Sequence, residues 1–171
     1  EKVESSVANV RVINIEKKFP NRVFINYVKL FEYFEFSQNG EFYYVSNSGD
    51  IVRVGKTAED DGEYIKLYIK GNAVAPSLGV KFETENDFVN TALPILLSAI
   101  ERIDARDVVV KLFEFADFSK NFVYLKTRTG VMFELQSCDN ALEKLRLGVS
   151  VYRDMTSAAD ERTKSGTIIL T

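Results

Sequence analysis

Residues 121–157 read NFVYLKTRTGVMFELQSCDNALEKLRLGVSVYRDMTS, and this stretch decides the fold class. Apolar and polar residues alternate over 121–128 and again over 131–136, which is the period of a half-buried strand. A Thr-Gly pair separates the two runs and suits a tight turn. Over about 140–157 the apolar residues instead recur every three or four positions, which is the period of a helix. Two strands followed directly by a helix predict an α+β arrangement.

A further strand is predicted beyond this helix. Asn140 and Glu143 have capping-box spacing and mark the start of the helix. A polar linker over 158–165 leads into a β-branched segment over 166–171, which favours a strand. The apolar stripe of the helix consists of Leu142, Leu145, Val149 and Tyr152.

An earlier helix is predicted over 84–103. Thr84 and Asp87 have capping-box spacing, so Thr84 is expected to cap this helix. Pro94 lies inside the helical pattern, where it either kinks the helix or marks the first turn of its main part. The apolar residues of the predicted buried face are Phe88, Ala92, Ile95, Ala99 and Ile103.

Strands dominate the remainder of the chain. Residues 10–30 form a predicted hairpin, because two alternating runs flank the turn formers Pro20 and Asn21. Further strands are predicted over 31–37, 41–46, 50–54, 64–69 and 107–115. Strands grouped with two main helices, without regular βαβ alternation, predict an α+β fold with a mixed or antiparallel sheet.

Composition excludes several classes of function. The chain of 171 residues contains no histidine and one cysteine. These counts exclude His-dependent hydrolases, His-based zinc sites and intramolecular disulfides. A net charge of −3 does not favour nucleic-acid binding. The sequence contains no apolar run long enough to span a membrane, and its start at Glu1 favours a processed or excised fragment.

Reactive side chains outside these classes are interpreted as structural. Residues 164–167 read Lys-Ser-Gly-Thr, which is similar to an element of penicillin-binding enzymes. Those enzymes also need a serine with a lysine three residues later, and this chain has none. Glu83 and Glu85 flank a predicted helix start, where negative charge is stabilising. Cys138 precedes the second helix and is interpreted as an unreactive residue at the helix boundary.

Aromatic residues concentrate between positions 31 and 44. The charges interleaved with them are glutamates, which repel phosphate, so base stacking is disfavoured. Burial in a sheet with both faces partly covered explains the aromatics better, and a protein-binding face is the second interpretation. The residues are Phe31, Tyr33, Phe34, Phe36, Phe42, Tyr43 and Tyr44.

Four stretches together resemble the extracytoplasmic part of the bacterial cell-division proteins FtsQ and DivIB. VANVRVINIEKKFPNRVFINYVKL, over 7–30, resembles the end of a POTRA module. GEFYYVSNSGDIVRV, over 40–54, resembles a hairpin of the β domain that follows that module. Residues 127–155, with Glu-Lys-Leu near the start of the helix, resemble the family's strand, strand and helix unit, and SGTI over 165–168 resembles the opening of its last strand.

The resemblance implies a two-part, non-enzymatic protein. Residues 1–30 correspond to the C-terminal portion of a POTRA-like module, and residues 31–171 to an FtsQ/DivIB-type β domain. Family members are single-pass proteins of the bacterial cytoplasmic membrane with most of their mass on the extracytoplasmic side, at the division septum. An N-terminal membrane helix absent from this chain is therefore expected. The family binds FtsB/DivIC-like and FtsL-like proteins and helps control septal peptidoglycan synthesis, and it implies no cofactor, metal or nucleic acid.

The resemblance also implies a site. The last strand of the family is a sheet edge that pairs with a strand of the partner by β-augmentation. The corresponding residues here are Gly166, Thr167, Ile168, Ile169 and Leu170. About five backbone hydrogen bonds do not offset the entropic cost of association, so helix or loop contacts are also expected. The candidate charge contacts are Arg153, Arg162 and Lys164.

A second hypothesis belongs to another class of function. The same chain is consistent with an extracytoplasmic ligand-binding or sensory domain that holds a lipid or cell-wall fragment in an aromatic-lined pocket. The full-length gene distinguishes the two hypotheses. A membrane span before a complete POTRA module favours the scaffold, whereas a lipoprotein signal or a fused kinase or transporter domain favours the sensor.

Overall fold

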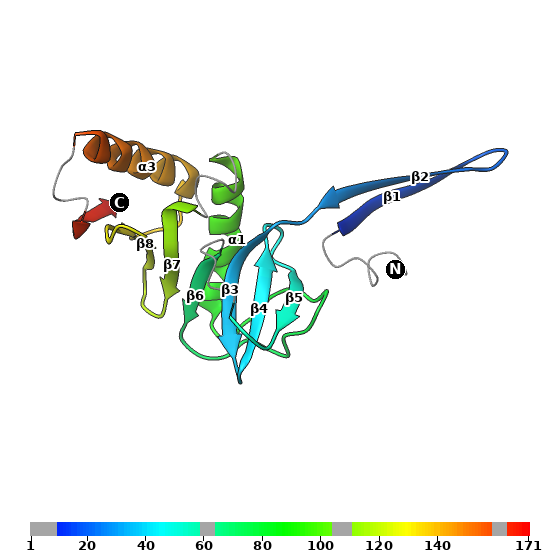
Figure 1. The fold of residues 1–171 in the computed structure, drawn as a ribbon, viewed down its shortest axis with the longest axis horizontal. Coiled ribbons are helices and arrows are strands. Elements are labelled where there is room, and N and C mark those ends of the chain that lie inside the picture. Colours follow the sequence, from blue (N-terminus) through cyan, green and yellow to red (C-terminus); the bar gives the residue numbers. More distant parts are fainter. Residues whose placement is uncertain (1–9, 59–63, 104–110, 159–163) are drawn as a thin grey trace.

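The computed structural model describes residues 10–58, 64–103, 111–158 and 164–171. Within these ranges an eight-stranded mixed sheet carries two long helices, and a separate two-stranded hairpin projects from one end (Figure 1). The strands are β1 (Val10–Lys18), β2 (Arg22–Lys29), β3 (Glu32–Gln38), β4 (Glu41–Ser46), β5 (Ile51–Gly55), β6 (Ile65–Ile69), β7 (Phe113–Phe118), β8 (Val123–Thr127), β9 (Met132–Leu135) and β10 (Thr167–Leu170). The helices are α1 (Asp87–Arg102) and α3 (Ala141–Ser157). The α+β class is therefore confirmed.

The large sheet has the strand order β10-β9-β8-β7-β6-β3-β4-β5. Hairpins pair β3 with β4, β4 with β5, β7 with β8 and β8 with β9 in antiparallel fashion. The three remaining pairs, β3 with β6, β6 with β7 and β9 with β10, are parallel because a helix or a longer connection lies between their members. The predicted strands and observed strands correspond closely, with one exception. β7 extends to Phe118, three residues beyond the predicted strand end. Lys111 and Leu112, which the prediction placed in the strand, are helical instead, and residues 107–110 lie outside the described residues.

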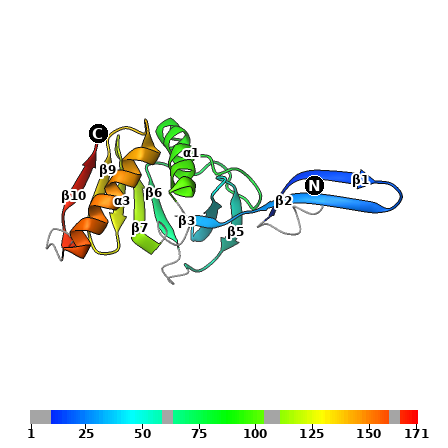
Figure 2. The ribbon, with the colours of Figure 1, turned by 90° about the horizontal axis from the view of Figure 1, so that it is seen from above.

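Both helices lie on the same face of the sheet, as Figure 2 shows from above. α1 buries its apolar stripe against the centre of the sheet, including Leu93, Leu96 and Ile100. Ile95, predicted to be on the buried face, is instead 40% exposed. The helix is apolar on more than one side, so its sequence is consistent with two overlapping apolar stripes. The stripe that contains Leu93, Leu96 and Ile100 packs on the sheet, and the stripe that contains Ile95 lies beside it.

Most of the aromatic cluster over 31–44 lies in the core. Five of its members are below a tenth exposed: Tyr33, Phe34, Phe36, Tyr43 and Tyr44. Tyr44 lies under Arg53, whose guanidinium carbon is 3.5 Å from the centre of its ring. Core burial thus accounts for most of these rings.

The start of α1 differs from its prediction. Asn86 is the N-cap, and its side-chain oxygen accepts a hydrogen bond from the backbone N–H of Phe88. The predicted cap, Thr84, is wrong: it lies before the helix and its hydroxyl bonds to the backbone of Asn86 instead. Asn90 Oδ1 in turn accepts the backbone N–H of Thr84 at 2.9 Å. The spacing of Thr84 and Asp87 fits a capping box, but the side chain of Asn86, two residues after Thr84, occupies the N-cap position instead.

The start of α3 matches its predicted position without the predicted contact. Asn140 is the N-cap, but its φ of 53° places it in the left-handed region and its side chain makes no capping hydrogen bond. Asparagine tolerates this region better than most residues. The helix begins at Ala141, one residue after the predicted start.

The hairpin of β1 and β2 has one mainly apolar face. Residues paired across the two strands share a face, so Ile15 with Ile25, and Val23 with Lys17, lie on one face. The other face pairs Asn14 with Asn26, and Phe24 and Val28 are its apolar members on β2. The first face is open to solvent among the described residues. Ile15, Val23, Ile25 and Tyr27 are 49%, 58%, 44% and 63% exposed.

Candidate partner-binding edge

β10 is the outermost strand of the described sheet, next to β9 (Figure 2). The two strands are parallel, with Ile168 opposite Phe133 and Leu170 opposite Leu135. The β-branched residues of this segment suit an extended backbone. The predicted last strand is therefore present, and within the part of the chain that the structure describes it borders one neighbour.

Backbone hydrogen bonds to β9 come from alternate residues along this segment. The carbonyl of Gly166 accepts from the N–H of Met132 at 2.9 Å, and the carbonyl of Leu170 accepts from Gln136 at 3.2 Å. In a parallel ladder, the residues between these positions alternate in the side to which they direct their N–H and C=O groups. Thr167 and Ile169 therefore direct their backbone polar groups to the open side of β10. This side is a template for an added strand.

The side chains of β10 also divide between two faces. Leu170 is 4% exposed and packs with Ile168 in the core beneath α3. Ile169 is 57% exposed on the opposite face, and Thr167 is exposed as well. Ile168 and Leu170 thus hold β10 in place, while Ile169 offers an apolar side chain beside its open backbone.

Gly148 allows α3 to lie close above β9 and β10. A Cβ atom at this position would be 2.9 Å from Phe133 Cε2 and 3.3 Å from Leu170 Cδ1. Phe133 is fully buried and its ring meets that of Phe113 edge to face, with 5.1 Å between the ring centres. The hydroxyls of Tyr152 and Thr129 are 2.8 Å apart and tie the helix to the turn between β8 and β9. The edge is consequently backed by a closely packed layer.

The flank of α3 above the open edge carries exposed apolar side chains. Arg146 donates to the backbone carbonyl of Arg102 at the end of α1, at 3.2 Å, which identifies the flank that faces α1. Leu147 and Val151 lie one turn apart on the other side of the helix, toward β10. They are 63% and 38% exposed. Neither residue belongs to the predicted apolar stripe of the helix. The sequence signal that could have identified them is an apolar residue on a helix position away from that stripe.

The predicted charge contacts do not gather at this edge. Arg153 is exposed, but it lies two turns after Arg146 and so belongs to the flank that faces α1. Lys164 is exposed just before β10, and its carbonyl lies so close to Gly130 that a Cβ there would overlap it. Arg162 lies outside the described residues. Of the three, Lys164 is placed next to the open strand.

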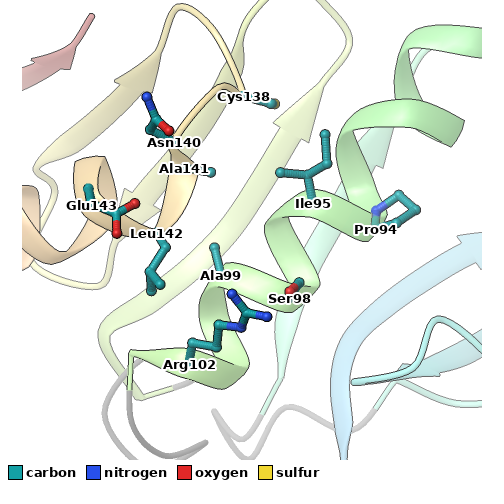
Figure 3. A pocket seen from close by; sticks show the side chains of 10 residues that line it. All are labelled: Pro94, Ile95, Ser98, Ala99, Arg102, Cys138, Asn140, Ala141, Leu142 and Glu143. Atoms are coloured by element: carbon teal, nitrogen blue, oxygen red, sulfur yellow. The ribbon is translucent and has the colours of Figure 1, made fainter.

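Two cavities beside α1, formed by described residues, differ from the aromatic-lined pocket of the second hypothesis. Figure 3 shows a cavity of about 450 Å³ between α1 and the start of α3, lined by aliphatic residues such as Ile95 and Leu142. Another, of about 330 Å³, lies beside the middle of α1 and contains one aromatic residue, Phe82. Burial raises the pKa of the Cys138 thiol at the rim of the first cavity, with Lys144 opposing the shift. This thiol is therefore a poor nucleophile at neutral pH.

The described residues contain no group of three or more Cys, Asp or Glu side chains arranged to hold a metal ion. Neither described helix is long and apolar enough to span a membrane. Comparison with protein-family models, with curated proteins and with solved structures finds no match to this chain.

Proposed function

We propose that this protein is a non-enzymatic scaffold that binds a partner chain through the open side of β10. In the FtsQ/DivIB family that the sequence resembles, the partners are FtsB/DivIC-like and FtsL-like proteins, and the complex helps control septal peptidoglycan synthesis. In this role the domain lies on the extracytoplasmic side of the bacterial cytoplasmic membrane, at the division septum.

The arrangement of β10 is the observation that carries the proposal. Thr167 and Ile169 each direct an N–H and a C=O group to the open side, which allows up to four backbone hydrogen bonds to a partner strand. Each contributes about 0.5–1.5 kcal/mol net, which is too little for stable association. Leu147 and Val151 supply apolar area above the same edge. A partner strand with alternate apolar side chains would contact this flank of α3 while it pairs with β10.

The exposed apolar face of the hairpin supports the assignment of residues 1–30 to a partial module. A two-stranded hairpin is marginally stable alone, and the apolar face of β1 and β2 is open among the described residues. An antiparallel sheet normally packs its more apolar face against other elements. The remainder of a POTRA-like module is the proposed cover.

A binding titration tests the proposed function. The chain is titrated with the C-terminal segment of the FtsB/DivIC-like protein encoded in the same genome, and the complex is followed by calorimetry. Saturable binding that is lost when Leu147 and Val151 are both replaced by glutamate supports the proposal. Arg153→Ala is the matched control, because Arg153 lies on the other flank of α3. Absence of binding, or equal affinity for the glutamate variant, contradicts the proposal.

A further inference from the structure

The hairpin joins the sheet through a short junction that the β4–β5 turn holds. β2 ends at Lys29 and β3 begins at Glu32, so Leu30 and Phe31 form the whole connection. Leu30 is 6% exposed. In Figure 1 this connection lies beside the end of β4, where residues 47–50 turn into β5.

Asn47 holds both backbone polar groups of Phe31. Its backbone N–H donates to the carbonyl of Phe31 at 2.9 Å, and its side-chain oxygen accepts the N–H of Phe31 at 3.2 Å. Its side-chain amide donates to Glu101 Oε1, at 3.0 Å, in the last turn of α1. One asparagine thus joins the junction, the sheet and the helix.

The turn that carries Asn47 is itself well ordered by hydrogen bonds. The hydroxyl of Ser48 donates to Asp50 Oδ2 at 2.5 Å, and the backbone N–H of Asp50 donates to Ser46 Oγ at 3.2 Å. Ser46 is fully buried. Asp50 also meets Arg11 of β1 at 3.8 Å, so the turn contacts the hairpin directly. The backbone that carries Asn47 is therefore held in one conformation by these contacts.

A cleft separates the hairpin from the sheet at this point. Its volume is about 490 Å³, and Ile13 and Val28 of the hairpin line it together with Asn47 and Glu101. Since no described side chain fills the cleft, hydrogen bonds at the junction have a large share in fixing the hairpin's direction.

We infer that Asn47 is a positioning residue that fixes the direction in which the hairpin leaves the sheet. It acts through Phe31 and Glu101 and determines how the POTRA-like portion is held relative to the β10 edge at the far end of the sheet. This inference rests on contacts at the junction and stands even if the proposed partner is wrong.

Distance measurements between spin labels test the inference. Labels are attached at Asn21→Cys in the hairpin turn and Ser119→Cys beyond β7, in a chain that also carries Cys138→Ser. Loss of the neutral hydrogen bond from Phe31 alone shifts the ratio of junctions with the hairpin in place to junctions with the hairpin released by about two- to twelvefold. Asn47→Ala removes both side-chain bonds and is expected to broaden the distance distribution.

A matched control removes a side-chain amide elsewhere on the sheet. Gln136 is exposed after β9 and donates to Glu134 Oε1 at 3.0 Å, away from the junction. Gln136→Ala is therefore expected to leave the distance distribution unchanged. Broadening by this control to the same extent as by Asn47→Ala would overturn the inference.

Exchanging the groups that meet at Glu101 separates positioning from a general loss of structure. Asn47→Asp keeps the acceptor for Phe31 but places a carboxylate against Glu101, so the distribution broadens. Adding Glu101→Gln restores a hydrogen bond, because the glutamine amide donates to the new carboxylate at position 47, and the distribution narrows again. An unchanged distribution for Asn47→Ala overturns the inference. So does a double variant that stays as broad as Asn47→Asp while both keep the melting temperature of the parent chain.

Discussion

Replacement of Ile169 by proline removes a backbone N–H that is directed to the open side of β10. Gly166 and Leu170 are hydrogen-bonded to β9, and in a parallel ladder every second residue bonds to the same neighbour. The N–H of Ile169, next to Leu170, therefore takes no part in the described ladder. Proline lacks the donor and its ring projects where an added strand would lie. The variant is therefore expected to bind the partner more weakly while the domain stays folded.

The expected magnitude follows from the number of bonds at the edge. Loss of one backbone hydrogen bond costs about 0.5–1.5 kcal/mol, and the displaced strand leaves a second polar group without its partner at a similar cost. Together these losses are about 1–3 kcal/mol, which weakens Kd by about 5- to 150-fold. The free energy of unfolding of the isolated chain is expected to change by less than about 1 kcal/mol, since the site is exposed.

Ile168→Pro is the matched control, one residue away. Its N–H is directed to β9, and its side chain is half-buried against the core. The control is expected to lower the free energy of unfolding by about 1–3 kcal/mol, because a carbonyl of β9 loses its donor. Calorimetric titration gives the Kd of each variant, and urea unfolding gives its stability. The reasoning is refuted if Ile169→Pro binds as tightly as the parent chain, or if it destabilises the domain as much as Ile168→Pro does.

Three further predictions concern α3 and its surroundings. Leu147→Glu and Val151→Glu are expected to weaken partner binding but to change the urea midpoint little, because both side chains are exposed; a large drop in the midpoint contradicts their placement. Gly148→Val is expected to destabilise the domain by about 1–3 kcal/mol in urea unfolding, because its side chain would overlap Phe133, which cannot move without strain; a stabilised variant refutes this. Cys138 is expected to react with iodoacetamide more slowly in the folded chain than in urea at pH 8, since its raised pKa lowers the thiolate fraction, and equal rates contradict the burial.

Periodicity in the sequence predicted β6, β8, β9 and both helices because each of them buries one regular face. The run over 131–136 became β9 with Phe133 and Leu135 inward, and Leu145, Val149 and Tyr152 are the buried side of α3. The capping rule gave the wrong residue at the start of α1, where two polar side chains compete for the N-cap position. Thr84 has the correct spacing for a cap, but Asn86 occupies it.

The details of the candidate edge could not be predicted from the sequence. Which residues of β10 direct their backbone outward depends on its register with β9, and a shift by one residue would exchange Ile168 with Ile169. The flank of α3 that carries Leu147 and Val151 depends on which side of the helix α1 occupies. Its charge and its place on the second helix make Arg153 a candidate contact, and neither property indicates the flank on which it lies.

Amide hydrogen exchange, measured residue by residue by NMR, tests the open edge most directly. In the isolated chain, the N–H groups of Thr167 and Ile169 are expected to exchange rapidly, whereas those of Ile168 and Leu170 are protected by β9. Addition of the partner segment is expected to protect Thr167 and Ile169 as well. Protection of all four amides in the isolated chain, or no gain at Thr167 and Ile169 in the complex, would contradict strand addition at β10.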